Sequence, residues 1–331
     1  MAEEGRCGGQ NATQKEWLRK DTRWESIIYH ADQKPRACDL PTDLRFLLQL
    51  PRTVLRTDQK NSVLTLTLDR SDKRNALSAD LVTALKDALA EASDDDAIRV
   101  IVLTGVGRAF SAGADLEALQ ALQTATEEEN LADSRHLSGL FEIITRHPKP
   151  IIAKVNGHAI AGGCGLAAVC DFSIVAEGAK LGFTETRIGF VPAIVAVFVL
   201  RKLGEAAVRD LFLRGHLIET AEAVRIGLVT RAVPADQLDA AVDKLAAELA
   251  RETSGSAVAL TKELLADLPG MGLTEALDFA ADLNARARAT DDCKAGIAAF
   301  LNKTDPPWKR ERVKGKREKG EGKRVKEKGK R

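Results

Sequence analysis

The sequence is poor in aromatic residues and has no paired cysteines. Phe, Trp and Tyr make up 4% of the 331 residues, whereas apolar residues of all kinds make up 44%. A core of this composition is built mainly from Ala, Val, Leu and Ile. The five cysteines are scattered and form no C-x-x-C pair, so neither a disulfide framework nor a zinc site is expected. We predict a protein without a metal ion, in a reducing, cytoplasmic setting.

Long apolar runs are missing as well. None approaches the roughly 18 residues that a membrane-spanning helix requires. The opening residues Met1-Ala2-Glu3-Glu4 lack the basic and then apolar layout of a secretory signal. No G-x-G-x-x-G motif follows a predicted strand, and no phosphate-binding loop is present. We therefore expect no membrane association and no nucleotide cofactor.

Positive charge is concentrated at the C-terminal end. The whole chain has a net charge of +1, yet residues 309–331 hold thirteen Lys and Arg against four Glu, so the rest is acidic. A segment with so little to bury is predicted to be disordered. Basic tails bind nucleic acid through salt-dependent phosphate contacts, but this one has no aromatic residues for base stacking. We expect a solvated tail without a nucleic-acid partner; a non-catalytic anion- or nucleic-acid-binding module is kept as an alternative function.

Hydrophobic patterning divides the chain into four parts. Residues 1–53 show little periodicity and are predicted to be a poorly ordered extension. Residues 54–234 alternate strand and helix signals, which predicts an α/β layered core. Residues 235–308 are helical in pattern and suit packing or contacts between subunits, and residues 309–331 are the basic tail.

The clearest strand and helix signals lie at a few places in the core. Residues 63–68 alternate apolar residues with Thr, which predicts a half-buried strand. Ser78 is a suitable N-cap for a helix that presents Leu81, Leu85 and Leu89 on one face. Further strands are predicted at 99–103 and 151–155, and further helices at 134–146, 238–251, 257–265 and 274–301.

The most informative stretch runs from residue 155 to residue 192. A glycine turn enters an apolar helix near Gly162, and one carboxylate, Glu185, follows downstream. A backbone donor beside a lone acid or base suits proton transfer next to a carbonyl, because the donor stabilises the enolate oxygen while the carboxylate moves the proton. Burial would raise the pKa of Glu185; the alternative is an exposed carboxylate paired with Arg187. The residues expected to shield Glu185 are Phe183, Ile188, Phe190 and Val191.

Four motifs occur in one order along the chain. They are R-S-D-K-R-N-A-L-S at 70–78, G-R-A-F-S-A-G-A-D-L at 107–116, N-G-H-A-I-A-G-G-C-G-L-A at 156–167 and F-T-E-T-R-I-G-F-V-P at 183–192. Together they resemble the enoyl-CoA hydratase/isomerase (crotonase) superfamily, and are closest to bacterial enoyl-CoA and methylglutaconyl-CoA hydratase-like proteins. The resemblance implies a crotonase-type α/β fold of repeated ββα units with a helical C-terminal region. It also implies a homotrimer or homohexamer.

The same resemblance implies a role for each site residue. The backbone N–H groups of Ala114 and Gly162 form an oxyanion hole for a thioester carbonyl, and Glu185 transfers the proton. The substrate is an acyl-CoA thioester, so CoA is part of the substrate and no separate cofactor is expected. The positions implied to line the substrate and its CoA are Arg74, Ala76, Leu77, Ala112, Asp115, Leu116, Phe300 and Lys303, the last two across a subunit boundary.

Gly165 departs from the pattern of many hydratases in this family. They carry a second Glu there, and the two carboxylates together hold the water that is added. The family's isomerases lack that Glu and use one carboxylate. The leading hypothesis is reversible hydration of a 2-trans-enoyl-CoA in fatty-acid or branched-chain acyl-CoA degradation, and the alternative is Δ3,Δ2-enoyl-CoA isomerisation. Residues 194–198 replace the common Pro-Gly-rich turn and are expected to reshape the acyl pocket.

Other polar residues near these motifs have simpler explanations. His158 is expected to make a structural hydrogen bond, and Cys164 and Cys170 are expected to be buried, neutral thiols. Ser111 has no His/Asp pattern that would make it a nucleophile. Glu117 is expected to be an exposed residue in the first turn of a helix.

Overall fold

Two β-sheets form the centre of the computed structural model, which describes residues 53–309. The main sheet has six strands in the order β1-β2-β3-β5-β7-β10, of which only β1 and β2 pair antiparallel. The second sheet has four strands in the order β4-β6-β8-β9, and β9 is its antiparallel strand. The bounds are β1 Leu55–Lys60, β2 Val63–Leu68, β3 Val100–Gly105, β4 Ala109–Ser111, β5 Ile151–Val155, β6 His158–Ile160, β7 Phe172–Ala176, β8 Lys180–Gly182, β9 Leu217–Glu219 and β10 Arg231–Val233.

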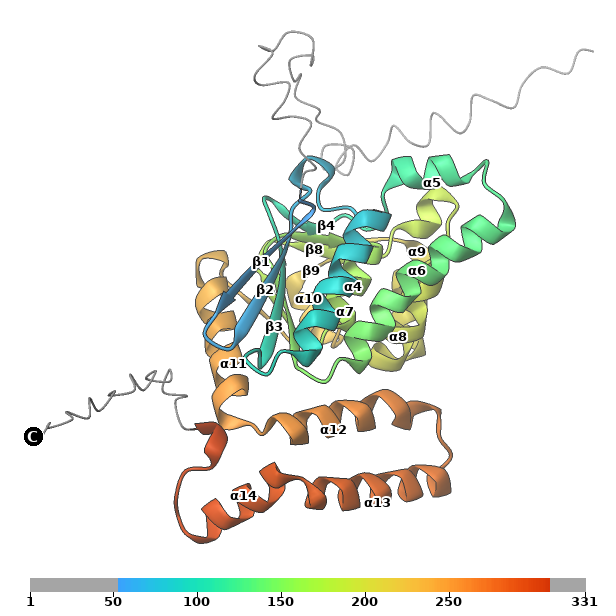
Figure 1. Ribbon diagram of the computed structural model, residues 1–331. Helices are drawn as coiled ribbons and strands as arrows, with labels where there is room; N and C mark the ends of the chain where they lie inside the picture. The colour runs from blue at the N-terminus through green and yellow to red at the C-terminus, as the bar shows by residue number, and fades with distance from the viewer. Residues whose placement is uncertain (1–52, 310–331) are drawn as a thin grey trace, which may run out of the picture. The chain divides into compact units, whose positions relative to one another are not determined.

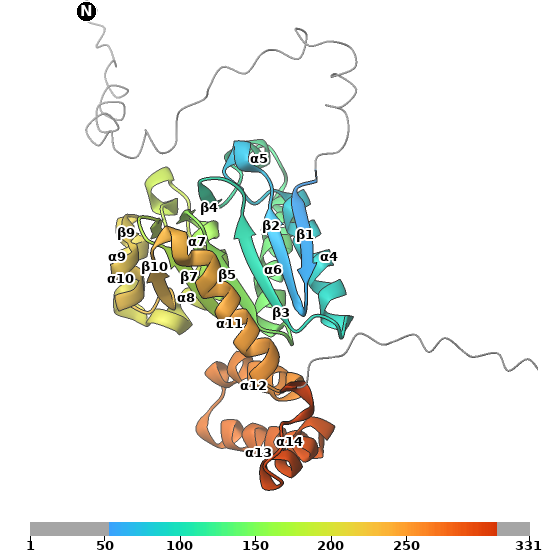
Figure 2. The ribbon, with the colours of Figure 1, turned by 90° about the vertical axis from the view of Figure 1, so that its left-hand side faces the viewer.

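Helices cover both faces of the main sheet, with α11 on one face and the larger group on the other (Figures 1 and 2). In β3, Val100 and Val102 pack against α11, whereas Ile101 and Leu103 pack into the larger core with α4, α6 and α7. A strand buried on both faces reads as a continuous apolar run, which is typical of parallel sheets. The bounds are α4 Ala79–Asp94, α5 Leu116–Leu122, α6 Glu127–Arg146, α7 Gly162–Val169, α8 Ala193–Leu203, α9 Glu205–Arg214, α10 Thr220–Arg225, α11 Leu238–Glu252, α12 Gly255–Asp267, α13 Leu273–Ala289 and α14 Asp291–Leu301.

The core repeats one unit: a strand of the main sheet, a strand of the second sheet, and a helix. The sets β3-β4-α5, β5-β6-α7 and β7-β8-α8 follow this order, with the short 3₁₀ helix η3 (Glu185–Ile188) between β8 and α8. Strands β4, β6 and β8 lie side by side and parallel. The loops that follow them therefore meet at one end of the second sheet. The α/β fold of repeated ββα units with a helical C-terminal region is confirmed.

Helix α12 is joined to the core by ion pairs. Lys262, which is 7% exposed, pairs with Asp171, and Arg146 of α6 pairs with Asp267 at 2.7 Å. The N-terminus of α14 is tied to that of α12, because Asp292 accepts hydrogen bonds from Ser254 and Ser256. Helices α12, α13 and α14 thus form a layered arm that begins where α11 ends (Figure 1).

Several element boundaries differ from the sequence predictions. The single helix predicted at 274–301 is wrong: the chain breaks at Thr290, whose side chain accepts a hydrogen bond from the Cys293 amide and starts α14. The helix predicted from residue 134 begins earlier, at Glu127, because Thr126 and Glu129 form a capping box. The strands at 63–68 and 151–155 and the N-cap at Ser78 are confirmed.

Two predicted parts lie almost wholly outside the described residues. The extension at 1–53 contributes only Thr53, and the tail at 309–331 contributes only Lys309, which pairs with Glu252 at 2.7 Å. The division of the chain into four parts stays a prediction. Within residues 53–309, no helix is both long and apolar enough to cross a bilayer.

Candidate active site

The loops that carry Ala114 and Gly162 touch each other at the end of the second sheet. A Cβ atom built on Gly113 would lie 2.9 Å from the Gly162 nitrogen, and one built on Gly162 would lie 3.8 Å from the Ala114 nitrogen. Gly113 also has a φ of +87°, which glycine adopts without strain. Glycine on both loops thus lets the two backbone amides approach each other.

Both amides are without an acceptor in the part of the chain that the structure describes. In the described range 53–309, no hydrogen bond is donated by the N–H of Ala114 or of Gly162. Gly162 is the first residue of α7, and the first N–H groups of a helix have no partner within the helix. The positive end of the helix dipole lies at the same place. Two neighbouring N–H donors are therefore available to one oxygen atom.

The residue before Gly162 is held in a strained conformation. Ala161 has a φ of 52° and a ψ of −128°, a region that glycine adopts far more readily than alanine. Its N–H donates to the Gly182 carbonyl at 2.8 Å, and its own carbonyl accepts from the Gly165 N–H at 3.1 Å. Strain of this kind costs on the order of 1–3 kcal/mol and persists only where the surroundings impose it. The fold therefore imposes the direction of the peptide that carries the Gly162 N–H.

Glu185 lies on the neighbouring loop, at the start of η3. Strand β8 pairs with β6 so that Gly182 faces Ile160, which places residue 185 shortly beyond the entrance to α7. The side chain is buried, with 8% of the residue exposed, and its Oε2 has no hydrogen-bond partner in the described part of the chain. Burial raises the pKa of Glu185 above its usual value.

The segment that carries Glu185 is joined to the start of α7, because β8 pairs with β6 and the Ala161 N–H donates to the Gly182 carbonyl at 2.8 Å. In agreement with this, burial raises the pKa of Cys164, on the first turn of α7, to about 12, and the charge of Glu185 contributes to the rise. A carboxylate with a raised pKa is suited both to accept and to donate a proton near neutral pH.

The surroundings of Glu185 differ in part from the prediction. Phe183 is fully buried and packs against Phe212 with ring centroids 4.7 Å apart. The other three residues expected to shield the carboxylate are exposed, so that expectation is wrong: Ile188 is 59%, Phe190 50% and Val191 61% exposed. They follow Glu185 on η3 and the turn after it, where the chain runs along the surface.

The pairing of Glu185 with Arg187, considered as the alternative, does not occur. The Arg187 Nε donates to the Arg214 carbonyl at 3.4 Å instead. Thr186 also ties η3 to the end of α9, because its hydroxyl donates to the Phe212 carbonyl at 2.9 Å. These two contacts hold the exposed side of η3, while Glu185 faces the interior.

A neighbouring helix occupies the space beside Gly165. A Cβ atom on Gly165 would lie 3.0 Å from the Cβ of Val195 and 3.1 Å from the Cε1 of Phe141, and closer still to a Val195 methyl group. Val195 is buried on α8, within the residues 194–198 that were expected to reshape the acyl pocket. A side chain at position 165 cannot be accommodated unless Val195 moves. The space beside Gly165 is therefore filled by apolar side chains and holds no carboxylate among residues 53–309.

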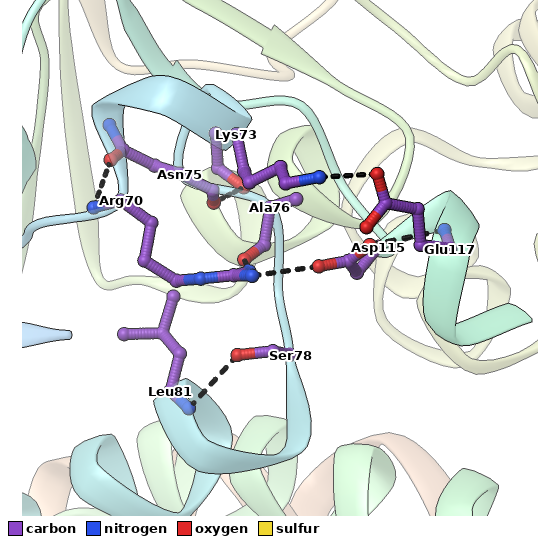
Figure 3. Close-up of polar contacts among 9 residues, drawn as sticks. Arg70, Lys73, Asn75, Ala76, Ser78, Leu81, Asp115 and Glu117 are labelled. Carbon is purple, nitrogen blue, oxygen red and sulfur yellow. Dashed lines mark hydrogen bonds and ion pairs between the residues drawn. The ribbon is translucent and has the colours of Figure 1, made fainter. Parts of the chain in front are cut away.

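Most residues implied to bind the substrate lie around the Ala114 loop. Leu77 forms a β-bridge with Ala114, and the Ala112 N–H donates to the Arg74 carbonyl at 3.0 Å. Asp115 accepts a hydrogen bond from Arg70 at 2.8 Å and caps the start of α5 (Figure 3). The burial of these residues differs: Ala76, Leu77 and Asp115 are buried, Arg74 and Ala112 are half-buried, and Leu116 is 57% exposed.

Phe300 and Lys303 are not brought to this place within one chain. They lie at the end of α14, and Phe300 is 84% exposed. Figures 1 and 2 both show α14 at the end of the described part opposite α5, the helix that follows Ala114. A contact between these residues and a bound CoA would therefore require a second copy of the chain.

The four other polar candidates have structural environments. The ring of His158 accepts a hydrogen bond from the Lys180 amide at 2.9 Å, and the Ser111 hydroxyl donates to the Asn75 carbonyl at 2.9 Å. Cys170, like Cys164, is buried, and burial raises its pKa to about 12. Glu117 is exposed in the first turn of α5 and pairs with Lys73.

Some residues that shape the site were not singled out in the sequence. Arg70 and Asn75 belong to the first motif, but nothing in their spacing shows that they hold the Ala114 loop. Phe141 and Val195 close the space beside Gly165, and they come from helices distant in the chain. These two residues can be recognised as supports of the Ala114 loop only once the contacts of that loop are known, and the full burial of Asn75 is visible only in the structure.

Comparisons with known proteins identify relatives of this chain. Residues 58–311 match the family model described as enoyl-CoA hydratase/isomerase. A putative enoyl-CoA hydratase of Thermus thermophilus is 44% identical over 75% of this chain and 98% of its own length. The crotonyl-CoA hydratase of Syntrophomonas wolfei is 34% identical over 76% of this chain and 96% of its own length.

Solved structures give the same result. A putative enoyl-CoA hydratase/isomerase (crotonase) from Legionella pneumophila superposes with a TM-score of 0.70 and 37% identity, covering 78% of this chain and 100% of that one. AtuE of Pseudomonas aeruginosa superposes with a TM-score of 0.74 and 34% identity over the same shares. The motifs, the ββα repeat and these matches agree, and the chain belongs to the enoyl-CoA hydratase/isomerase family.

Proposed function

We propose that the protein adds water reversibly across the 2,3 double bond of a 2-trans-enoyl-CoA, with Glu185 as the acid and base. One observation carries the proposal: two neighbouring backbone N–H groups without partners lie near a buried carboxylate whose Oε2 is also without one, within residues 53–309. The family match and the relatives named as hydratases support the same reaction class.

The proposed reaction follows from the charges that develop. The N–H groups of Ala114 and Gly162 bind the thioester oxygen, which becomes negative when a water oxygen attaches to C3. Glu185 takes a proton from that water and then delivers a proton to C2, so that one carboxylate serves both steps. Losing one donor of this kind costs on the order of 10²–10³ in rate.

The single carboxylate also supports a second candidate, Δ3,Δ2-enoyl-CoA isomerisation. Val195 and Phe141 close the space beside Gly165 where a second carboxylate would stand. Proton transfer along an acyl chain needs one acid and base and no bound water, so this wall favours an isomerase. Hydration with one carboxylate requires the water to be held by a backbone group or by the substrate.

Isotope labelling separates the two candidates. We expect single-turnover incubation with crotonyl-CoA in ¹⁸O water to place label at C3 of the product, because the attacking oxygen comes from the solvent. Heat-inactivated protein is the control for uncatalysed addition. Absence of label, together with transfer of deuterium between C2 and C4 of a 3-enoyl-CoA, would establish the isomerase instead.

We also propose that the chain assembles with copies of itself through the arm. Helix α13 buries only Leu283 and α14 only Ala299, whereas Leu273, Leu277 and Phe300 are 79%, 61% and 84% exposed. Apolar patches of this kind mark interaction surfaces. A second copy would also bring Phe300 and Lys303 to the CoA of its neighbour, where the Lys303 ammonium can meet a phosphate.

Charge on the exposed apolar face of α13 should weaken this assembly. We expect the full chain to sediment as a trimer or hexamer, and Leu277→Asp to lower its mass towards that of the monomer, because a buried unpaired carboxylate is costly. Asp282→Asn, a one-unit charge change on another face of α13, is the matched control. A wild-type chain that sediments as a monomer at all concentrations would contradict the proposal.

The non-catalytic alternative loses its support, because the chain belongs to a family of enzymes. Residues 310–331, which carry nearly all of the basic tail, lie outside the described residues. The expectation that the tail has no nucleic-acid partner stays a prediction. Steeply salt-dependent binding to nucleic acid, lost on truncation after Trp308, would contradict it.

A further inference from the structure

The guanidinium of Arg70 binds two parts of the site at once. Its Nη1 donates to the Ala76 carbonyl at 2.5 Å, and its Nη2 donates to the Asp115 carboxylate at 2.8 Å (Figure 3). The side chains of Arg70 and Asp115 are 17% and 10% exposed, so water screens the charges only in part. The positive charge of Arg70 therefore lies between the segment that contains Ala76 and the loop that carries Ala114 and Asp115.

The hydrogen bond to Ala76 is the first of a connected series. The peptide that contains the Ala76 carbonyl also contains the Leu77 N–H, which donates to the Gly113 carbonyl at 2.7 Å. The peptide that contains the Gly113 carbonyl also contains the Ala114 N–H. Arg70 is thus joined to the Ala114 N–H by two peptide groups that are hydrogen-bonded in one direction.

The geometry of the peptide unit makes this series directional. In a planar trans peptide the C=O and N–H bonds point in opposite directions, so a donor bound at the oxygen fixes where the N–H points. Hydrogen bonds in a chain also polarise one another, by about 10–30% for each bond. A cation at the first carbonyl therefore makes the last N–H a stronger donor.

The rest of the loop holds this series in place. Asn75 is fully buried in a left-handed conformation with a φ of 55°, and its side-chain amide donates to the Val106 and Ala109 carbonyls at 3.0 and 2.9 Å. Its side-chain oxygen accepts from the Arg70 amide at 3.0 Å. Arg70 is therefore fixed at its backbone as well as at its guanidinium.

We propose that Arg70 is a positioning residue that aims and polarises the Ala114 N–H of the oxyanion hole through the peptides 76–77 and 113–114. This inference rests on the proposed function, since it requires the Ala114 N–H to bind the thioester oxygen. In this proposal the charge of Arg70 acts on the thioester oxygen through two peptide groups and not by direct contact.

Asp115 permits a test that separates polarisation from simple tethering. Burial by itself would raise the pKa of Asp115, but the hydrogen bond and the charge of Arg70, together with the backbone N–H groups of Glu117 and Ala118, outweigh it and hold the pKa below its usual value. The carboxylate is therefore ionised and partly neutralises Arg70. If Arg70 only tethers the loop, Asp115→Asn and Arg70→Gln should have the same effect. If Arg70 polarises the series, they should differ.

The experiment measures polarisation of a bound carbonyl. The probe is the CoA thioester of 4-dimethylaminocinnamic acid, whose absorption band moves to longer wavelength as its carbonyl is polarised. We expect Arg70→Gln to lose a large part of the band shift and about tenfold in kcat, less than the ~10²–10³ that removal of a donor costs. Arg70→Lys, which keeps the charge, should restore most of the shift.

Two further variants complete the design. Asp115→Asn is expected to keep or enlarge the shift, because the charge that opposes Arg70 is removed. Lys73→Gln removes a neighbouring cation whose side chain pairs with Glu117 and donates to neither peptide of the series, so the shift should change much less than in Arg70→Gln. Circular dichroism and the probe dissociation constant show that each variant is folded and binds.

The possible outcomes test the oxyanion hole and the role of Arg70 separately. A wild-type protein that binds the probe without any band shift would overturn the oxyanion hole and with it the proposed function. A wild-type shift that Arg70→Gln retains in full would overturn the role of Arg70 alone. An equal loss in Arg70→Gln and Asp115→Asn would also overturn polarisation, because it indicates a tether.

Discussion

Glu185→Gln is expected to lower kcat by about 10²–10⁴-fold while the protein still binds CoA thioesters, because the amide keeps the shape of the side chain but cannot transfer a proton. Glu185 is buried, and its Oε2 has no partner within residues 53–309. Stopped-flow hydration of crotonyl-CoA gives kcat, and competition with a product CoA thioester gives the affinity. Glu117→Gln, which removes an exposed carboxylate near the same site, should leave kcat unchanged.

The same substitution should stabilise the fold at neutral pH. Burial raises the pKa of Glu185, so the folded chain binds more protons than the unfolded chain between the two pKa values. Stability therefore falls as the pH rises from the ordinary Glu value of about 4.3 through the raised value. Gln has no charge to bury, and we expect a gain of about 0.5–2 kcal/mol at pH 7. The gain should disappear well below pH 4.3, where the wild-type carboxyl is protonated in both states.

The pH dependence of the reaction has the same origin. If Glu185 must be ionised to take a proton from water, kcat falls on the acid side below the raised pKa and not near the usual Glu value.

Two results for Glu185→Gln would contradict the proposed role. If this variant keeps kcat within about threefold of the wild type, Glu185 does not transfer the proton. Loss of turnover together with loss of binding would instead indicate a damaged pocket.

Gly165→Glu is expected to destabilise the protein by more than about 3 kcal/mol. The first side-chain atom would already lie 3.0 Å from the Val195 Cβ and 3.1 Å from Phe141. Overpacking of a filled core costs about 1–3 kcal/mol, and a buried carboxylate without a partner adds to that cost. Urea unfolding at one fixed protein concentration measures the change in the free energy of unfolding.

A second substitution tests the steric cause directly. In a Val195→Ala background, the methyl group closest to position 165 is gone. Gly165→Ala should then lower the free energy of unfolding by at least about 1 kcal/mol less than it does in the wild type.

Gly270→Glu is the matched control for Gly165→Glu, since a Cβ at Gly270 meets nothing within 4 Å. If Gly165→Glu and Gly270→Glu change the unfolding free energy equally, Val195 does not close the site.

The elements predicted well are those whose signals are local. The alternation at 63–68 and the N-cap at Ser78 depend on neighbours in the chain, and the structure has both. The break at Thr290 was missed because an apolar pattern continues across it, whereas a side-chain cap ends one helix and starts the next. The strands of the second sheet were not singled out, since three residues carry too little periodicity.

The burial of residues near Glu185 shows the same limit. Phe183 and Ile188 are both apolar and near Glu185 in sequence, yet one is fully buried and the other 59% exposed. The burial of an apolar side chain is favourable, but it occurs only where another segment of the chain covers that side chain. The packing of η3 against α9 decides which side chain faces the interior.

The sequence by itself determined the family, the alternation of strands and helices in the core and the residue types of the site, because motifs and caps are local patterns. Only the tertiary structure decided that Val195 fills the space beside Gly165, and that Arg70 is joined to the Ala114 N–H through two peptide groups. Both depend on contacts between segments far apart in the chain. Such contacts are set by packing and by the direction of individual hydrogen bonds, which no local pattern records.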